Sequence, residues 1–198
     1  MIGSIKRLVL GVAVNLCLVQ GAVYAETPME QLQETIQQVM VAMNSAGKGN
    51  NPELREKLRD ALMPRFDWFE MAKQTLGKHW STVPNRQHEF VAVFAEFLGN
   101  SYIGKIGSYK DEKIVFVHEA IEKNLAQVNT KIVSSKGEPT SVNYRLHRVQ
   151  GEWKIYDVVV EDISVVANYR SQFNRILANA SFDDLIRRLK EKDSNHKD

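Results

Sequence analysis

The hydrophobic repeat of this sequence changes at about residue 113, and that change restricts the chain to one class of fold. From residue 28 to residue 106, apolar side chains recur every three or four residues, as on one face of an amphipathic helix. From residue 114 to residue 160, apolar and polar side chains alternate, as in a half-buried strand. Helical spacing returns after residue 164. This order of repeats predicts an α+β domain.

Four helices are predicted before the change of repeat. They begin at Pro28, Pro52, Asp67 and Pro84, because proline fits the first turn of a helix and aspartate caps it. The longest extends to Ile106, and its apolar face is wide and rich in aromatic residues. That face carries Phe90, Val93, Phe94, Phe97, Leu98, Tyr102 and Ile106.

The alternating region is predicted to form four strands with short connections, which is the pattern of an antiparallel meander. The expected strands cover residues 114–119, 126–132, 142–147 and 153–160. Two more helices should follow, capped by Ser164 and Ser181. We therefore expect a single domain in which the helices cover one side of a curved four-stranded sheet.

Residues 1–25 have the pattern of a cleaved secretory signal peptide. Lys6 and Arg7 precede an apolar run from Leu8 to Val19, and Val23-Tyr24-Ala25 provides a small-x-small cleavage site. The run is too short for a stable membrane span. Export by a cleaved signal peptide predicts a periplasmic location. The exported part would consist of one domain, residues 26–192, and a flexible tail, residues 193–198.

The signal peptide contains two basic residues, no acidic residue and the one cysteine of the chain, Cys17. Its removal leaves 24 basic and 24 acidic residues, so we expect no general nucleic-acid binding. A thiol-free chain also excludes disulfide scaffolds, cysteine-ligated zinc and cysteine nucleophiles.

Polar residues that could form a catalytic or metal site are few. The five histidines lack the spacing of a metal site, and we expect none; phosphate-binding glycine loops and nucleophile elbows are absent from the sequence. Asp157, Glu161 and Asp162 lie close together in the sequence and could act in acid–base chemistry. We favour a structural role, because negative charge there suits the N-terminus of the helix after Ser164.

Two blocks of sequence carry a more specific pattern. The first comprises Phe66–Ala72, Leu76–Trp80 and Arg86–Phe90, with Phe94 after it. The second comprises Val142–Leu146, Trp153–Val158, Glu161–Val166 and Asn168–Phe173. In order and spacing, these blocks resemble the MlaC (toluene-tolerance) family of periplasmic phospholipid-binding proteins over roughly residues 30 to 190.

The resemblance implies an NTF2-like core that encloses an apolar cavity and a carrier role without catalysis or cofactor. Its cargo would be a glycerophospholipid, with both acyl tails buried and the headgroup outside. Its partners would be the outer-membrane MlaA–porin complex and the inner-membrane MlaFEDB ABC transporter, reached through MlaD, in an Mla-type lipid-asymmetry system.

Elementary energetics favour such a carrier. Two acyl chains hold about 30 methylene groups at about 0.8 kcal/mol each, so exposing them to water costs on the order of 24 kcal/mol. A protein that buries the tails needs a dry apolar cavity and no particular polar group, in agreement with the few polar candidates above.

We expect the lining to come from the long helix, from one face of the sheet and from the helix after it. The predicted residues are Phe90, Phe94, Phe97, Leu98, Tyr102, Val128, Ile132, Val142, Tyr144, Val158, Val166, Tyr169 and Phe173. The same stripes also suit a plain core, and the sequence does not separate the two roles. Arg145, Arg170 and Asp157 are candidates for an internal ion pair or for partner docking.

Two alternatives remain open from the sequence. One is a carrier for hopanoids or another apolar lipid. The other is an NTF2-like enzyme that uses Asp157 or His147 as a base near Tyr144 or Tyr156.

Overall fold

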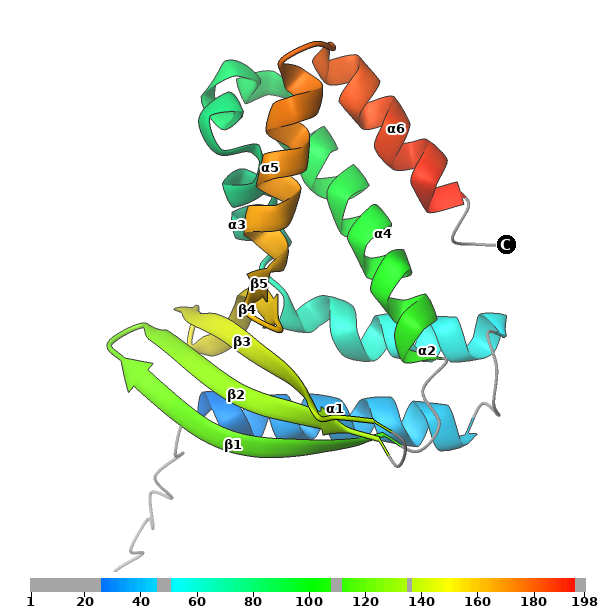
Figure 1. Cartoon of the computed structure of the whole chain (residues 1–198), viewed down its shortest axis with the longest axis vertical. Coiled ribbons are helices and arrows are strands. Elements are labelled where there is room, and N and C mark those ends of the chain that lie inside the picture. Colours follow the sequence, from blue (N-terminus) through cyan, green and yellow to red (C-terminus); the bar gives the residue numbers. More distant parts are fainter. Residues whose placement is uncertain (1–25, 46–50, 108–111, 135–136, 195–198) are drawn as a thin grey trace, which may run out of the picture.

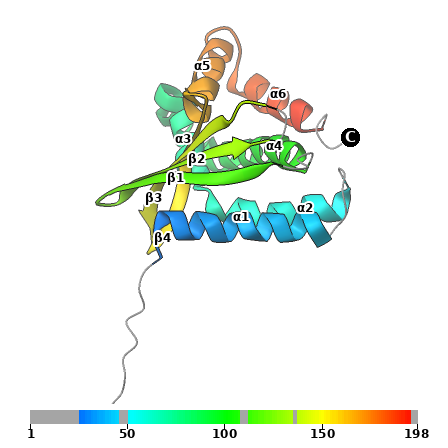
Figure 2. The same ribbon diagram turned by 60° about the horizontal axis from the view of Figure 1, so that its bottom comes forward.

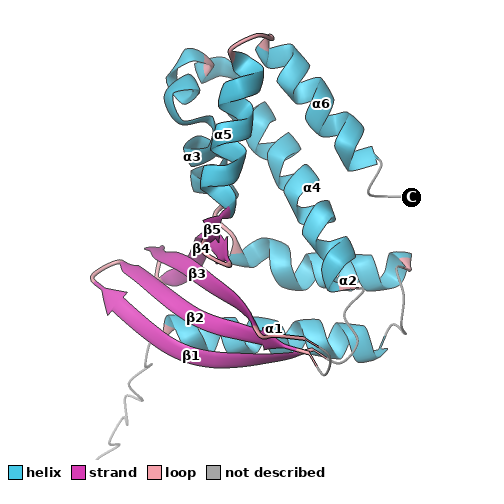
Figure 3. Ribbon diagram, in the orientation of Figure 1, coloured by secondary structure: helices cyan, strands magenta, loops and turns pink. Residues whose placement is uncertain are grey.

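The computed structural model describes residues 26–45, 51–107, 112–134 and 137–194, and the predicted signal peptide lies outside them. The α+β class is confirmed (Figures 1 and 3). The helices are α1 (Pro28–Ser45), α2 (Pro52–Leu62), η1 (Met63–Arg65), α3 (Trp68–Leu76), η2 (Gly77–Thr82), η3 (Pro84–Arg86), α4 (Gln87–Ile106), α5 (Val165–Leu177) and α6 (Phe182–Ser194). The strands are β1 (Lys113–Glu122), β2 (Leu125–Val133), β3 (Thr140–Val149), β4 (Glu152–Val160) and β5 (Ile163–Ser164).

The sheet is antiparallel as expected, but it has five strands in the order β1-β2-β3-β4-β5 rather than four. The additional strand pairs Ile163 with Val160 and Ser164 with Val159. Between them, Glu161 and Asp162 have φ angles of 46° and 63°. Two consecutive left-handed residues form a tight hairpin turn, which folds the chain back on β4.

Most predicted helix ends are confirmed by capping hydrogen bonds. Asp67 accepts from the amide of Glu70, and Ser164 accepts from the amide of Ala167. The long helix starts at Gln87 rather than Pro84, because residues 84–86 form a separate 3-10 turn. Helix α6 continues two residues into the predicted tail, where Asp193 accepts a 2.6 Å hydrogen bond from Asn100.

The helices pack on the sheet in two places. Helix α1 packs on β1 and β2 and lies beside α2 (Figure 2). Helices α3 and α5 pack on β4, near the edge of the sheet that is farthest from β1. Helix α4 contacts α3 and α6 and continues to α2, so it connects the two helical regions (Figure 1).

Three apolar clusters follow from this arrangement. The helical cluster, from α3 to α6, contains Met71, Ala72, Leu76, Phe90, Phe94, Phe97, Leu98, Val165, Val166, Phe173, Leu185, Ile186 and Leu189. The sheet cluster contains Leu32, Ala126, Val128, Leu146, Trp153 and Ile155. The third contains Val39, Ala42, Leu54, Leu58 and Ile103, between α1, α2 and α4. Phe66 and Val158 pack against both of the first two clusters.

A buried carboxylate connects β4 to α5. Asp157 is 2% exposed and accepts hydrogen bonds from the Ser164 hydroxyl at 2.7 Å and the Val166 amide at 3.1 Å. Arg145 Nη1 donates to it at 3.0 Å, which confirms the internal ion pair that the sequence offered as one role for these residues. The carboxylate thus lies at the N-terminus of α5, where amides that have no partner within the helix favour a negative charge.

We expect Asp157→Asn to lower the free energy of unfolding by about 2–4 kcal/mol, because it removes the charge paired with Arg145 and directs an amide donor at other donors. Ser164→Ala, which removes the cap and the Ser164 donor to Asp157 but keeps the carboxylate, should cost about 1 kcal/mol. Urea denaturation of both variants measures the difference. Equal effects would show that the carboxylate contributes no more than the cap.

Candidate functional site

The predicted lining residues of the sheet share one face. Val128 pairs with Tyr144, and Tyr144 pairs with Val158. Ile132 and Val142 follow at even spacings along β2 and β3, so they point to the same side. In β4, Tyr156 has no partner on β3, and this bulge keeps Ile155 and Val158 on the same face.

The polar candidates lie on the opposite face. Arg145 and His147 alternate with Tyr144 and Leu146 along β3, and Asp157 pairs with Arg145. His147 Nε2 lies 2.9 Å from the carboxylate of Asp67, and its ring packs edge-on against Tyr156. These contacts join the start of α3 to the sheet. Neither Asp157 nor His147 faces the predicted lining.

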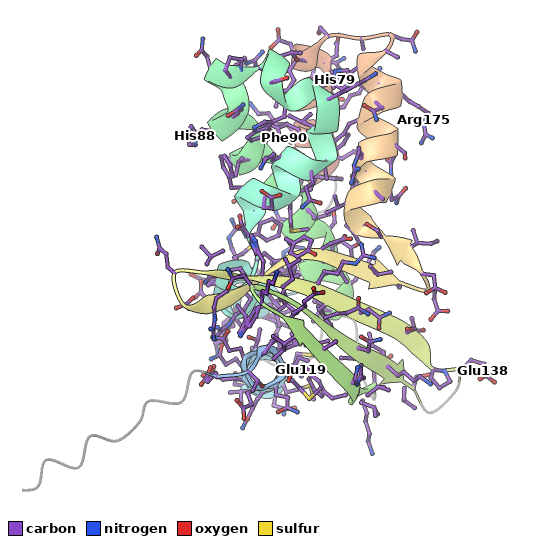
Figure 4. The ribbon with its side chains drawn as sticks, turned by 90° about the vertical axis from the view of Figure 1, so that its left-hand side faces the viewer. His79, His88, Phe90, Glu119, Glu138 and Arg175 are labelled. Carbon is purple, nitrogen blue, oxygen red and sulfur yellow. The ribbon has the colours of Figure 1, made fainter. Side chains whose placement is uncertain are left out.

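The predicted residues of α4 and α5 form a continuous aromatic wall. Phe97 lies 5.6 Å from Tyr169, and Phe94 lies 6.1 Å from Tyr169 and 6.2 Å from Phe173, between ring centroids. Phe90 lies 5.8 Å from Phe173, inside the helical cluster (Figure 4). The interplanar angles of these four pairs are 84–89°, the favourable edge-to-face arrangement.

The structure therefore divides the predicted residues into two groups. Phe90, Phe94, Phe97, Leu98, Val166 and Phe173 belong to the helical cluster, with Tyr102 and Tyr169 partly buried against it. Val128 belongs to the sheet cluster with Tyr144 against it, whereas Val142 is buried and Ile132 half-buried on the same face. Val158 is the predicted residue that packs on both groups.

An open groove of about 350 Å³ lies between α4, α5 and α6. Three predicted residues, Phe97, Tyr169 and Phe173, line it. The sequence analysis missed the other apolar lining residues, Ile176, Leu185 and Leu189. Their helical spacing marked α5 and α6 as amphipathic, but spacing alone does not show which neighbouring helix lies opposite.

The aromatic wall is electrically neutral. Burial raises the pKa of Tyr169 to about 12, and the nearby Tyr102 hydroxyl adds to the effect.

Among the residues that the structure describes, no three His, Cys, Asp or Glu side chains are grouped so as to hold a metal ion. No described helix is both long and apolar enough to cross a membrane.

Comparison with known proteins agrees with the sequence pattern. The family described as MlaC protein matches residues 30–191. The chain belongs to the MlaC family. This family consists of lipid-binding carriers rather than enzymes, so the enzyme alternative is set aside.

Two relatives and one solved structure support the assignment. The intermembrane phospholipid transport system binding protein MlaC of Haemophilus influenzae is 24% identical over 184 residues, covering 88% of this chain and 86% of that protein. The toluene tolerance protein ttg2D of Pseudomonas putida is 26% identical over 157 residues, covering 76% and 73%. A phospholipid-binding protein from Ralstonia solanacearum, solved in complex with a phospholipid, has a similar fold, with a TM-score of 0.71, 20% identity, and 85% and 97% of the chains covered.

Phe94→Ala should lower the free energy of unfolding by about 3–5 kcal/mol, because this fully buried ring contacts both Tyr169 and Phe173. Phe69→Ala, at a ring that is 44% exposed, is the matched control and should cost about 1 kcal/mol or less. Thermal or urea unfolding gives both values. A small loss at Phe94 would mean that this ring is not part of the packed core.

Alkaline titration tests the burial of Tyr169. The absorbance change of the native protein should contain one component with a midpoint near pH 12, which Tyr169→Phe removes. Because the folded pKa is raised above the reference value of 10, Tyr169 stabilises the fold fully below pH 10, and this contribution is lost as the pH rises toward 12. A midpoint near 10 would contradict the burial.

Proposed function

We propose that this protein is a periplasmic phospholipid carrier of an Mla-type system, which moves glycerophospholipid between the outer and inner membranes. The observation that carries the proposal is the family match over residues 30–191. The relative from Haemophilus influenzae is named as a phospholipid transport binding protein, and the structural neighbour from Ralstonia solanacearum was solved with a phospholipid.

The contacts support an acyl-chain site between the two predicted groups. The aromatic wall supplies carbon surface on one side, and the face of Val128, Tyr144 and Val158 supplies it on the other. In an NTF2-like core, tails that enter between these groups meet no unpaired charge from Asp157 or His147, which face the other way. Burial of the tails offsets the large cost of exposing them to water.

The proposed partners are membrane complexes at both ends of the route: the MlaA–porin complex of the outer membrane, and MlaFEDB of the inner membrane, reached through MlaD. The proposed location requires cleavage after Ala25. A chain without its signal peptide has balanced charge, so we expect these partners to be recognised by shape and local contacts rather than by net charge.

Protein purified from bacterial cells should carry bound phospholipid at a stoichiometry near one. Native mass spectrometry, with mass analysis of an organic extract, measures the bound species. A hopanoid in the extract would instead support the alternative cargo. Protein with only its apo mass and no lipid in the extract would overturn the carrier proposal.

Val158→Glu should reduce the lipid that co-purifies with the protein by at least about tenfold, because a carboxylate would then lie between the helical cluster and the sheet cluster. Val115→Glu on β1 is the matched control, since Val115 is 47% exposed. Circular dichroism establishes that both variants are folded before lipid is measured. Equal lipid content in the two variants would place the tails elsewhere.

A further inference from the structure

A second concave region continues the groove between α4, α5 and α6. It measures about 400 Å³ and lies between α5, the following turn and α6. Its lining residues are Gln172, Arg175, Ile176, Asn179, Ala180 and Arg188. Gln172, Ile176 and Arg188 also line the first groove, so the two regions form one continuous surface, which we call the α5–α6 groove.

The two regions of the α5–α6 groove differ in chemistry. In the first groove, Phe97, Phe173 and Leu189 are at most 4% exposed and form an apolar floor, and the charged residues Arg188, Glu191 and Lys192 also line it. In the second region, the side chains of Arg175 and Arg188 are exposed at the rim, and Arg175 projects outward from α5 (Figure 4). An apolar floor therefore adjoins basic side chains along one open surface, which is the polarity of an amphiphile.

The arginines at the rim are available for a ligand. Within the described part of the chain, neither Arg175 nor Arg188 forms an ion pair. Their neighbour Arg187 differs, because it donates to Asp184 at 3.0 Å and to Glu191 at 2.9 Å. Among the described residues that line the α5–α6 groove, Glu191 is the one carboxylate, and this contact with Arg187 engages it.

We propose that the α5–α6 groove binds the phosphate-bearing end of a phospholipid, with Arg175 and Arg188 donating to the phosphate oxygens. The adjoining part of an acyl chain lies on the floor formed by Phe97, Phe173 and Leu189. Guanidinium groups suit this task because their fork of N–H donors matches phosphate oxygens. This inference rests on the proposed carrier function and names the cargo group that these residues contact.

The proposed contact predicts a particular selectivity. Arg175 and Arg188 would bind the phosphate itself, which anionic and zwitterionic phospholipids share. Discrimination between headgroups should therefore be weak, whereas a lipid without phosphate should gain nothing from the two arginines.

Calorimetry with short-chain soluble lipids tests the contact. We expect the double variant Arg175→Gln/Arg188→Gln to bind dihexanoyl phosphatidylglycerol and dihexanoyl phosphatidylcholine about tenfold more weakly than wild type. Lys190→Gln is the matched control, because it removes one positive charge from an exposed position of α6 outside the groove, and its affinities should stay within about twofold. Dihexanoylglycerol, which lacks phosphate, should bind wild type and the double variant equally.

Three results would overturn the groove assignment. A loss confined to phosphatidylglycerol would indicate long-range attraction instead of a phosphate contact. An equal loss in Lys190→Gln would indicate a general effect of charge. Inorganic phosphate that binds wild type as tightly as the lipids do, with the same loss in the double variant, would identify a free-anion site.

Thiol protection locates the lipid independently. Cleavage of the signal peptide would remove Cys17, so a cysteine introduced at Gln172 would be the one thiol of the mature protein. Lipid should slow its reaction with maleimide about tenfold, and Asn168→Cys, one turn earlier on α5 and outside the groove, should be unaffected. If the Gln172→Cys variant still binds lipid but its labelling rate is unchanged, the groove assignment is wrong and the carrier function is unaffected. If the wild-type protein binds no lipid, the carrier function itself is wrong.

Discussion

The carboxylate of Asp157 holds the helical region and the sheet in one arrangement. It accepts from Arg145 on the neighbouring strand, from the Ser164 cap and from the first turn of α5. Asp157 and the Val166 amide are both buried, so leaving either of them without its hydrogen-bond partner would be costly. The orientation of α5, and with it the aromatic wall, depends on this contact.

The polar contacts around β3 and β4 are confined to one face of the sheet. Asp157 with Arg145 and His147 with Asp67 lie there, opposite the face of Tyr144 and Val158. On the latter face, a carboxylate contact occurs at the edge strand β1, where Glu119, the partner of Val128, accepts from the Met29 amide and attaches α1. A lipid carrier benefits from this separation around β3 and β4 because a carboxylate next to acyl tails would lose its hydration without gaining a partner.

Local signals predicted the parts of the fold that depend on local chemistry. Asp67 and Ser164 are caps in the sequence and in the structure, because a side-chain oxygen needs only the amides of its own helix. Strand β5 was missed because two residues show no alternation. Phe94 and Phe97 share one stripe, yet Phe97 lines the groove and Phe94 is enclosed by α5. That difference depends on where α5 and α6 lie relative to α4, and the spacing of apolar residues along α4 does not show this.

The bulge at Tyr156 has a consequence for how related sequences align. Ile155 faces the sheet cluster, Asp157 faces the N-terminus of α5, and the unpaired residue between them sets this change of side. Without the extra residue, Ile155 and Asp157 would be consecutive, and consecutive strand residues point to opposite faces, so Ile155 would still pair with Leu146 and Asp157 with Arg145. Relatives that keep this architecture should therefore tolerate a gap at this column, at the cost of the ring contact between Tyr156 and His147.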